Sequence, residues 1–264
     1  MLMPETISSA ANSLLKEVRR AVARGGLTAE GWCVAETPHL LDEALRSRCR
    51  VKVVLAAESA RGRLPRLPGV KVAILPDALL QRVSGTETSQ GVMALIEPPE
   101  WKLEQLFQGK SLVVVLDGVQ DPGNAGAILR AAEAFGASGA MFLKGTASPF
   151  NPKTLRASAG SLFRVPFLFG MEPALARAAI EERRVALYAA APARPDQPMR
   201  SPADVDLASP CGLIIGNEAH GVSREWRGAA REISIPTVSV ESLNAAMAAG
   251  ILLYEARRQR TRLP

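Results

Sequence analysis

The apolar run SLVVVLDG at residues 111–118 limits the possible folds more than any other feature of the sequence. An unbroken apolar run that ends in a polar turn is typical of a parallel strand buried on both faces. The turn QDPGN and an apolar helical pattern at 125–136 follow it. Further strand patterns lie at 139–144, 185–190, 211–216 and 231–236, and helical patterns at 153–163, 172–184 and 241–260. This alternation predicts an α/β fold, an open and mostly parallel sheet with helices on both faces.

The first hundred residues show a shorter version of the same alternation. Strand patterns lie at 31–36, 51–56, 70–75 and 91–97, and helical patterns at 8–24, 39–47 and 77–83. They predict a small α/β domain of about 90 residues. The segment EPPEW at 97–101 carries two prolines among charges and is typical of a domain boundary. We therefore expect two domains, 1–97 and 98–264.

Composition narrows the class of protein. Hydrophobic residues make up 47% and charged residues 22% of the 264 residues, an ordinary globular mixture. No apolar run approaches the roughly 20 residues that span a bilayer, and the start MLMPETISSA lacks the pattern of a secretion signal. The three cysteines are far apart and form neither a disulfide framework nor a metal-ligand spacing. We expect a cytoplasmic protein that needs no metal.

The charge of the chain allows, but does not require, a nucleic-acid partner. The formal net charge is +6. Residues 46–66 form a basic patch with seven cations, Arg46, Arg48, Arg50, Lys52, Arg61, Arg63 and Arg66, against only Glu58. The first four occupy every second position up to the strand pattern VKVVLA, so an extended backbone would direct them to one face. A second cluster consists of Arg257, Arg258, Arg260 and Arg262. These are candidate RNA contacts; the alternative is a solvated surface and a basic helix end.

Three polar segments follow predicted parallel strands: DGVQDPGNAG, GNEAHGVS and PTVSVESLNAA. In parallel α/β sheets, ligands bind beyond the carboxyl ends of the strands. The topology therefore predicts that all three segments lie on one rim of the sheet and form a site there.

The first segment supplies Asn124 and Arg130. Asn124 is a favourable N-cap type for the helix that follows. Arg130, six residues later, could extend to solvent or point into the rim site. In the first case the segment is simply a capped helix with a surface arginine. The glycines at 118, 123 and 126 do not have the G-x-G-x-x-G spacing of dinucleotide-binding proteins.

The second segment places Gly216 and Gly221 around Asn217 and Glu218. Glycines at a strand end permit positive φ or a close approach of the backbone to a ligand. A purely structural turn is the equal alternative, because an acidic residue is also favourable near a helix start. His220 has no visible partner for general-base catalysis, and we expect it to be a bystander.

The third segment precedes the long C-terminal helix. Ser242 is a typical N-cap residue, and Asn244 would then lie on the first turn. Small residues follow at Ala245, Ala246, Ala248, Ala249 and Gly250. They predict close helix packing, within the chain or across a dimer.

Taken together, these segments resemble a known family. LDGVQDPGNAGAILRAAEAFG, KTLRASAGSLFRVP, LIIGNEAHGVS and ISIPTVSVESLNAAMAAGILLYEARRQR are similar, in order and over about 111–260, to the motifs of the SpoU (TrmH-like) branch of the SPOUT RNA methyltransferases. ETPHLLDEAL and VSGTETSQGVMALIEPP resemble segments of that family's N-terminal substrate-binding domain.

The resemblance implies transfer of a methyl group from S-adenosyl-L-methionine to a ribose 2′-hydroxyl of RNA. It leaves the kind of RNA open, and the separate N-terminal domain favours 23S ribosomal RNA over transfer RNA. The resemblance also implies a homodimer and a trefoil knot in the C-terminal methyltransferase domain. The positions that match the family's catalytic residues are Arg130, Asn124, Glu218, Ser242 and Asn244. Those expected to bind the cofactor are Gly216, Asn217, Gly221, Ile235, Pro236 and Leu243. Arginine keeps its proton in nearly every protein environment, so we expect Arg130 to stabilise a developing alkoxide rather than act as a base.

Two alternatives stay open from the sequence. One is a non-catalytic RNA-binding relative of the same fold, which the joint presence of Asn124, Arg130, Glu218 and Asn244 disfavours. The other is a nucleotide-dependent oxidoreductase on a doubly wound sheet, which the absent glycine fingerprint disfavours.

Overall fold

The computed structural model describes residues 4–192 and 200–261. The chain forms two compact units, one of Met1–Glu100 with Ser148–Phe163, the other of Trp101–Ala147 with Arg164–Pro264. The segment 148–163, from the second half of the chain, is therefore part of the first unit. A single cut at 97/98 does not separate these units, because the chain passes between them three times.

The first unit contains a mixed five-stranded sheet of order β1-β4-β3-β5-β2. Its strands are β1 (Glu5–Thr6), β2 (Cys33–Glu36), β3 (Arg50–Ala57), β4 (Lys71–Leu75) and β5 (Val92–Glu97). β5 pairs antiparallel with both β2 and β3, while β4 pairs parallel with β3 and β1. The four apolar runs of the sequence therefore become strands β2 to β5 of this sheet, as predicted.

Four helices belong to this unit: α1 (Ser13–Arg24), α2 (Pro38–Arg46), α3 (Asp77–Val83) and α5 (Pro152–Ser158). Two predictions about them were wrong. The helix expected at 8–24 begins only at Ser13, because the Asn12 side chain accepts the amides of Leu14 and Leu15. The helix expected at 153–163 breaks after α5, where Ala159 and Gly160 take positive φ values of 48° and 91°.

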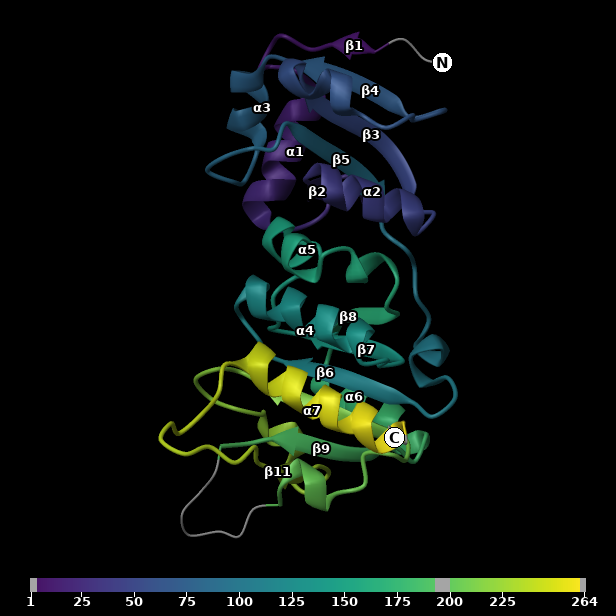
Figure 1. Cartoon of the computed structure of the whole chain (residues 1–264), viewed down its shortest axis with the longest axis vertical. Helices are drawn as coiled ribbons and strands as arrows, with labels where there is room; N and C mark the ends of the chain where they lie inside the picture. The colour runs from purple at the N-terminus through teal and green to yellow at the C-terminus, as the bar shows by residue number, and fades with distance from the viewer. Residues whose placement is uncertain (1–3, 193–199, 262–264) are drawn as a thin grey trace. The chain divides into compact units, whose positions relative to one another are not determined.

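The second unit is built on a six-stranded sheet of order β11-β9-β10-β6-β7-β8, and every pairing within it is parallel (Figure 1). The strands are β6 (Leu112–Asp117), β7 (Gly139–Leu143), β8 (Phe167–Met171), β9 (Ala186–Ala190), β10 (Cys211–Gly216) and β11 (Arg231–Ile233). This confirms the predicted parallel α/β fold. The sequence did not predict β8, an edge strand on which only Phe167 is buried.

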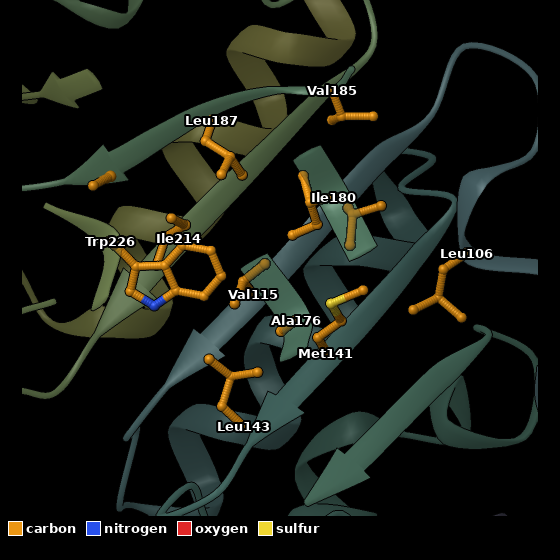
Figure 2. Close-up of a cluster of buried hydrophobic side chains, with 12 residues drawn as sticks. Leu106, Val115, Met141, Leu143, Ala176, Ile180, Val185, Leu187, Ile214 and Trp226 are labelled. Atoms are coloured by element: carbon orange, nitrogen blue, oxygen red, sulfur yellow. The ribbon is translucent and has the colours of Figure 1, made fainter. Parts of the chain in front are cut away.

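Helices cover both faces of this sheet. On one face, α6 (Pro173–Glu182) packs Ala176 and Ile180 against Val115, Met141 and Ile214, and buried Trp226 closes the cluster (Figure 2). Elsewhere on the sheet, α4 (Pro122–Ala134) lies beside α7 (Ala245–Arg260), the yellow helix of Figure 1. Burial on both faces explains why β6 is apolar from Leu112 to Leu116 and buried along its whole length.

Small residues let α7 pack closely. Ala245, Ala249 and Ala256 are buried within the chain together with Leu252 and Leu253. At the helix end, the Arg260 guanidinium donates to four carbonyl oxygens, those of Leu207, Lys110, Ser111 and Ser209. The close packing predicted from the alanines is confirmed inside the chain.

Candidate functional site

The candidate site lies at the carboxyl ends of the two central strands of the second unit. β6 and β10 pair in parallel up to their last residues, with Asp117 opposite Gly216. The loop from β6 leads into α4, and the turn from β10 begins at Asn217. The segment after β11 leads into α7, which packs beside α4. The rim predicted from topology is therefore present.

A chain of hydrogen bonds joins all three segments. Asn244 Nδ2 donates to Asn124 Oδ1 over 3.0 Å, and Asn124 Nδ2 donates to Glu218 Oε1 over 2.9 Å. The second carboxylate oxygen of Glu218 accepts the backbone amide of Gln120 at 3.4 Å. The structure thus brings together three side chains that are 94 and 120 residues apart in the sequence.

The orientation of each amide in this chain is fixed. Asn244 Oδ1 caps α7 by accepting the backbone amides of Ala246 and Met247. Only Nδ2 is then left to face Asn124, which must present its oxygen to Asn244 and its Nδ2 to Glu218. Glu218, whose side chain is exposed, keeps carboxylate lone pairs free toward solvent. The cluster therefore offers a fixed hydrogen-bond acceptor at the rim.

Both predicted helix caps in this region were wrong. Asp121, not Asn124, caps α4, since its carboxylate accepts the amide of Asn124 at 2.8 Å and Pro122 occupies the first helical position. Asn244, not Ser242, caps α7. Helix α4 therefore begins earlier than predicted, at Pro122, and α7 begins later, at Ala245. In both places an asparagine side chain takes part in the hydrogen-bonded cluster.

The turn after β10 requires the glycine at position 216. A Cβ there would lie 2.3 Å from the Gly221 carbonyl carbon and 2.5 Å from the Val222 nitrogen, both backbone atoms. Asn217 and Gly221 exchange two backbone hydrogen bonds, and Asn217 Nδ2 donates to the Gly118 carbonyl over 2.8 Å. Gly221 has φ +67°. The expected close approach is real, and here it is made by the chain's own backbone.

Sequence reasoning missed two buried polar residues that support this rim. Asp117, the last residue of β6, is 5% exposed and accepts the Ser223 amide at 2.7 Å. Thr146 Oγ1 donates to the Leu116 carbonyl and accepts the Gly118 amide. An aspartate at the end of a fully apolar strand was the only sequence signal for either of them.

The other predicted site residues lie around the cluster or outside it. Ile235 and Leu243 are half-buried, and Pro236 and Ser242 are exposed. Arg130 is exposed on α4, about 9 Å along the helix axis from Asn124, and makes no hydrogen bond or ion pair within residues 4–192 and 200–261. The structure does not bring Arg130 or Ser242 into the hydrogen-bonded chain.

The alternating cations at 46–52 do not form one extended face. Arg46 ends helix α2, Arg48 takes φ 57°, and β3 begins only at Arg50, so the alternation prediction was wrong. Several of these cations are also paired. Arg46 contacts Glu43 at 3.2 Å, and Lys52 and Arg50 share Glu97 at 2.7 and 3.8 Å.

The Glu97 carboxylate responds to this pairing: its hydrogen bond with Lys52 lowers the pKa of Glu97. In the second basic cluster, Arg258 pairs with Glu255, and Arg260 holds backbone carbonyls. Arg262 lies outside the described residues.

Within the described part of the chain, no group of three or more His, Cys, Asp or Glu side chains could hold a metal ion. None of the described helices has the length and hydropathy to span a membrane.

A six-stranded parallel sheet with polar loops tied together at its carboxyl edge defines an α/β protein of the class that binds a small ligand at that edge. Residues 111–254 match the model of the SpoU rRNA Methylase family. Residues 38–102 match that of the RNA 2′-O ribose methyltransferase substrate-binding domain.

Individual proteins give the same result. The 23S rRNA (guanosine(2553)-2′-O)-methyltransferase RlmP of Bacillus subtilis is 31% identical over 257 residues, covering 95% of this chain and 98% of the relative. The 23S rRNA (uridine(2479)-2′-O)-methyltransferase of Streptomyces viridochromogenes is 36% identical over 205 residues, 76% of this chain and 71% of the relative. Among solved structures, the SpoU methyltransferase AviRb from S. viridochromogenes in complex with AdoMet matches with a TM-score of 0.80 at 28% identity, covering 94% of this chain and 99% of that one.

The chain belongs to the SpoU rRNA Methylase family. It is therefore an RNA 2′-O-methyltransferase that uses S-adenosylmethionine, and the oxidoreductase alternative is wrong.

Proposed function

We propose that this chain methylates a ribose 2′-hydroxyl of 23S ribosomal RNA in the cytoplasm, as a homodimer and without a metal ion. The observation that carries the proposal is the hydrogen-bonded chain Asn244–Asn124–Glu218 at the rim of the sheet. The two relatives named above carry names of 23S rRNA methyltransferases, and the one from Bacillus subtilis matches nearly the whole chain, which supports the choice of RNA.

The rim residues fit the cofactor chemically. The strand-end turn exposes backbone at Gly221, and the half-buried side chains of Ile235 and Leu243 offer apolar surface for an adenine ring. Pro236, Gly216 and Asn217 complete the set of loop residues proposed to hold it. When bound, S-adenosylmethionine supplies a methyl group already activated on a sulfonium, so the reaction needs no Lewis acid.

The protein's task is to position the ribose hydroxyl and to assist the loss of its proton. Glu218 is suited to accept a hydrogen bond from that hydroxyl, because Asn124 fixes one of its oxygens and the carboxylate stays open to solvent. Asn124 and Asn244 act on the RNA through Glu218 and are positioning residues. Arg130 makes no hydrogen bond or ion pair in the described part of the chain and can pair with the RNA, where its charge would stabilise a developing alkoxide.

The role of Arg130 is tested by single-turnover methylation with saturating RNA and cofactor. Arg130→Ala should keep near-normal cofactor affinity and lose about 10²-fold in turnover, the scale seen for one donor to a developing oxyanion. Arg130→Lys should recover only part, since an ammonium cannot reproduce the planar fork. Arg227→Ala, which removes another exposed arginine of the same unit, is the control. Near wild-type turnover for Arg130→Ala would remove Arg130 from the mechanism.

An exposed apolar stripe on α7 supports the homodimer. Met247, Ile251 and Tyr254 are 57%, 38% and 52% exposed and lie on one side of the helix at spacings of four and three residues. Exposed apolar surface of this kind marks interaction sites, and we assign a second copy of the chain to it. Ile251→Glu should give monomers in light scattering, whereas Leu175→Glu, at a 63% exposed leucine on α6, should not. A monomeric wild-type protein at micromolar concentration would refute the dimer. The trefoil knot also stays a prediction.

The choice of RNA is tested directly. Purified protein with labelled S-adenosylmethionine should methylate in-vitro-transcribed 23S rRNA at one ribose, with activity unchanged by a chelator. Mapping of 2′-O-methyl groups in cells with and without the gene should locate the same site. Methylation of transfer RNA alone would overturn the proposed substrate.

A further inference from the structure

The first unit contains a groove that no part of the preceding mechanism uses. It has a volume of about 610 Å³, within the range of roughly 300–1,000 Å³ that holds small ligands. It lies where β3 ends at Ala57, and its wall includes residues of α3 and of the segment 89–91. Every residue that lines it falls within 38–102, the part of the chain that matches the substrate-binding model.

The walls of the groove are held by a network of hydrogen bonds. Gln81 Nε2 donates to the carbonyls of Thr86 and Glu87, and its Oε1 accepts the amide of Ser89. The Gly85 amide donates to buried Glu36 at 2.7 Å. These bonds fix the loop 84–91 in place and leave Gln81 without a free donor, so Gln81 is a structural residue of the groove.

Three other polar side chains of the lining are available to a ligand. Arg63 and Gln90 are exposed and make no hydrogen bond or ion pair within the described ranges. The Asp77 carboxylate accepts the amide and hydroxyl of Ser59, which lowers the pKa of Asp77, and each of its oxygens keeps one further lone pair. A guanidinium, an amide and a carboxylate together match a phosphate and the polar edge of a base.

The groove lies apart from the alternating cations at 46–52, although Arg63 itself belongs to the longer basic patch predicted at 46–66. β3 begins at Arg50 and ends at Ala57, so the alternating cations and the groove lie at opposite ends of one strand, about 23 Å apart. Among the alternating cations, Arg46, Arg50 and Lys52 have carboxylate partners, while Arg63 at the groove has none in the described residues. Arg63 can meet a phosphate without first giving up an ion pair, which favours the groove over those three cations.

We infer that this groove binds an unpaired nucleotide of the substrate RNA, with Arg63 on its phosphate and Gln90 and Asp77 on its base edge. The inference rests on the proposed function. No aromatic side chain lines the groove, so recognition would come from the hydrogen-bonding edge of the base rather than from stacking. RNA loops and bulges present such unstacked bases, and a duplex does not.

The test measures binding of the full-length protein to labelled in-vitro-transcribed 23S rRNA over a range of salt, together with the RNA KM and kcat for methylation. Arg63→Ala should weaken binding about tenfold and reduce the salt slope by about 0.7, the value for one single-strand phosphate. Gln90→Ala should weaken binding with an unchanged slope. Both should raise the RNA KM and leave kcat and cofactor affinity unaltered.

Two matched controls separate the possible results. Arg19→Ala removes an exposed arginine of the same unit that is outside the groove and should have no effect. The triple replacement of Arg46, Arg48 and Arg50 by Ala tests the rival alternating cations. Equal behaviour of the Arg63→Ala and Arg19→Ala variants in an active enzyme would overturn the groove, and a large effect of the triple variant alone would place the RNA at the alternating cations. A wild-type protein that binds and methylates no 23S rRNA would instead refute the proposed function.

Discussion

Replacing Gly216 by alanine is the sharpest test of how the rim is built. The added Cβ would lie 2.3 Å from the carbonyl carbon of Gly221, whereas ordinary contacts begin near 3.4 Å. The neighbouring atoms are backbone, so the turn 217–221 must move by roughly 1 Å. Such overpacking costs about 1–3 kcal/mol, and loss of the Asn217–Gly118 hydrogen bond adds about 1 kcal/mol. We expect Gly216→Ala to lower the free energy of unfolding by about 2–4 kcal/mol.

The same displacement moves Glu218 away from Asn124. A shift of about 1 Å at a catalytic centre can cost 10²-fold in rate, and the cofactor would lose the contact with the turn that we propose for it. Urea unfolding, calorimetry with S-adenosylmethionine and single-turnover methylation measure the three effects. Gly212→Ala, on the same strand, is the control, because its Cβ would crowd the tip of Leu187 at 2.8 Å and lie at an ordinary 3.7 Å from the Val113 carbonyl oxygen. It should destabilise the fold by about 1 kcal/mol without a change in cofactor affinity. An unchanged cofactor affinity in Gly216→Ala would refute this account of the rim.

Three further predictions concern groups outside the site. Burial raises the pKa of Cys33 to about 12, so its thiolate fraction at pH 8 is about 10⁻⁴, and mass-mapped alkylation of the native protein should modify half-exposed Cys49 before Cys33. The lowered pKa of Glu97 adds stability that is present above about pH 4.5 and lost as the pH falls through the folded-state value, so Lys52→Met should flatten the fall in the urea midpoint between pH 5 and pH 3. Arg156 contacts Glu36, which is 4% exposed, at 2.5 Å; Arg156→Ala should cost about 2–3 kcal/mol in urea unfolding, and Glu36→Gln in the same chain should recover part of it.

The fold was largely predictable because its central strands β6 and β10 are runs without a charged residue until their last position, and each is followed by a polar turn. The predictions that failed concern elements whose formation depends on tertiary contacts. β8 is an edge strand with exposed Phe169, so it lacks the apolar signal of a buried strand. The helix expected at 153–163 stops because Gly160 packs against Glu43, where a Cβ would lie 2.6 Å from the Glu43 Cβ. No local pattern contains that contact.

The site was predictable in its location and only partly in its construction. The strand-end rule placed Asn124, Glu218 and Asn244 on one rim, and the structure joins them directly. Sequence spacing could not show that two asparagines hold one carboxylate, since that depends on which residue caps each helix. The spacing of Arg46, Arg48 and Arg50 also led to a wrong prediction of one extended face. These cations follow one another from the end of a helix through a turn into a strand.

The segment 148–163 belongs to the methyltransferase half by sequence but packs with the substrate-binding unit. Just before it, Ala147 donates its amide to Val119 in the loop that leads to the site. Within it, Arg156 pairs with Glu36, whose other oxygen accepts the amide of Gly85 in the loop 84–91. The segment that follows Ala147 thus helps to hold the loop 84–91 through one buried carboxylate. A fragment ending at residue 97 would lack Arg156 and leave Glu36 buried without its cation, so the substrate-binding unit is complete only when the methyltransferase half is present.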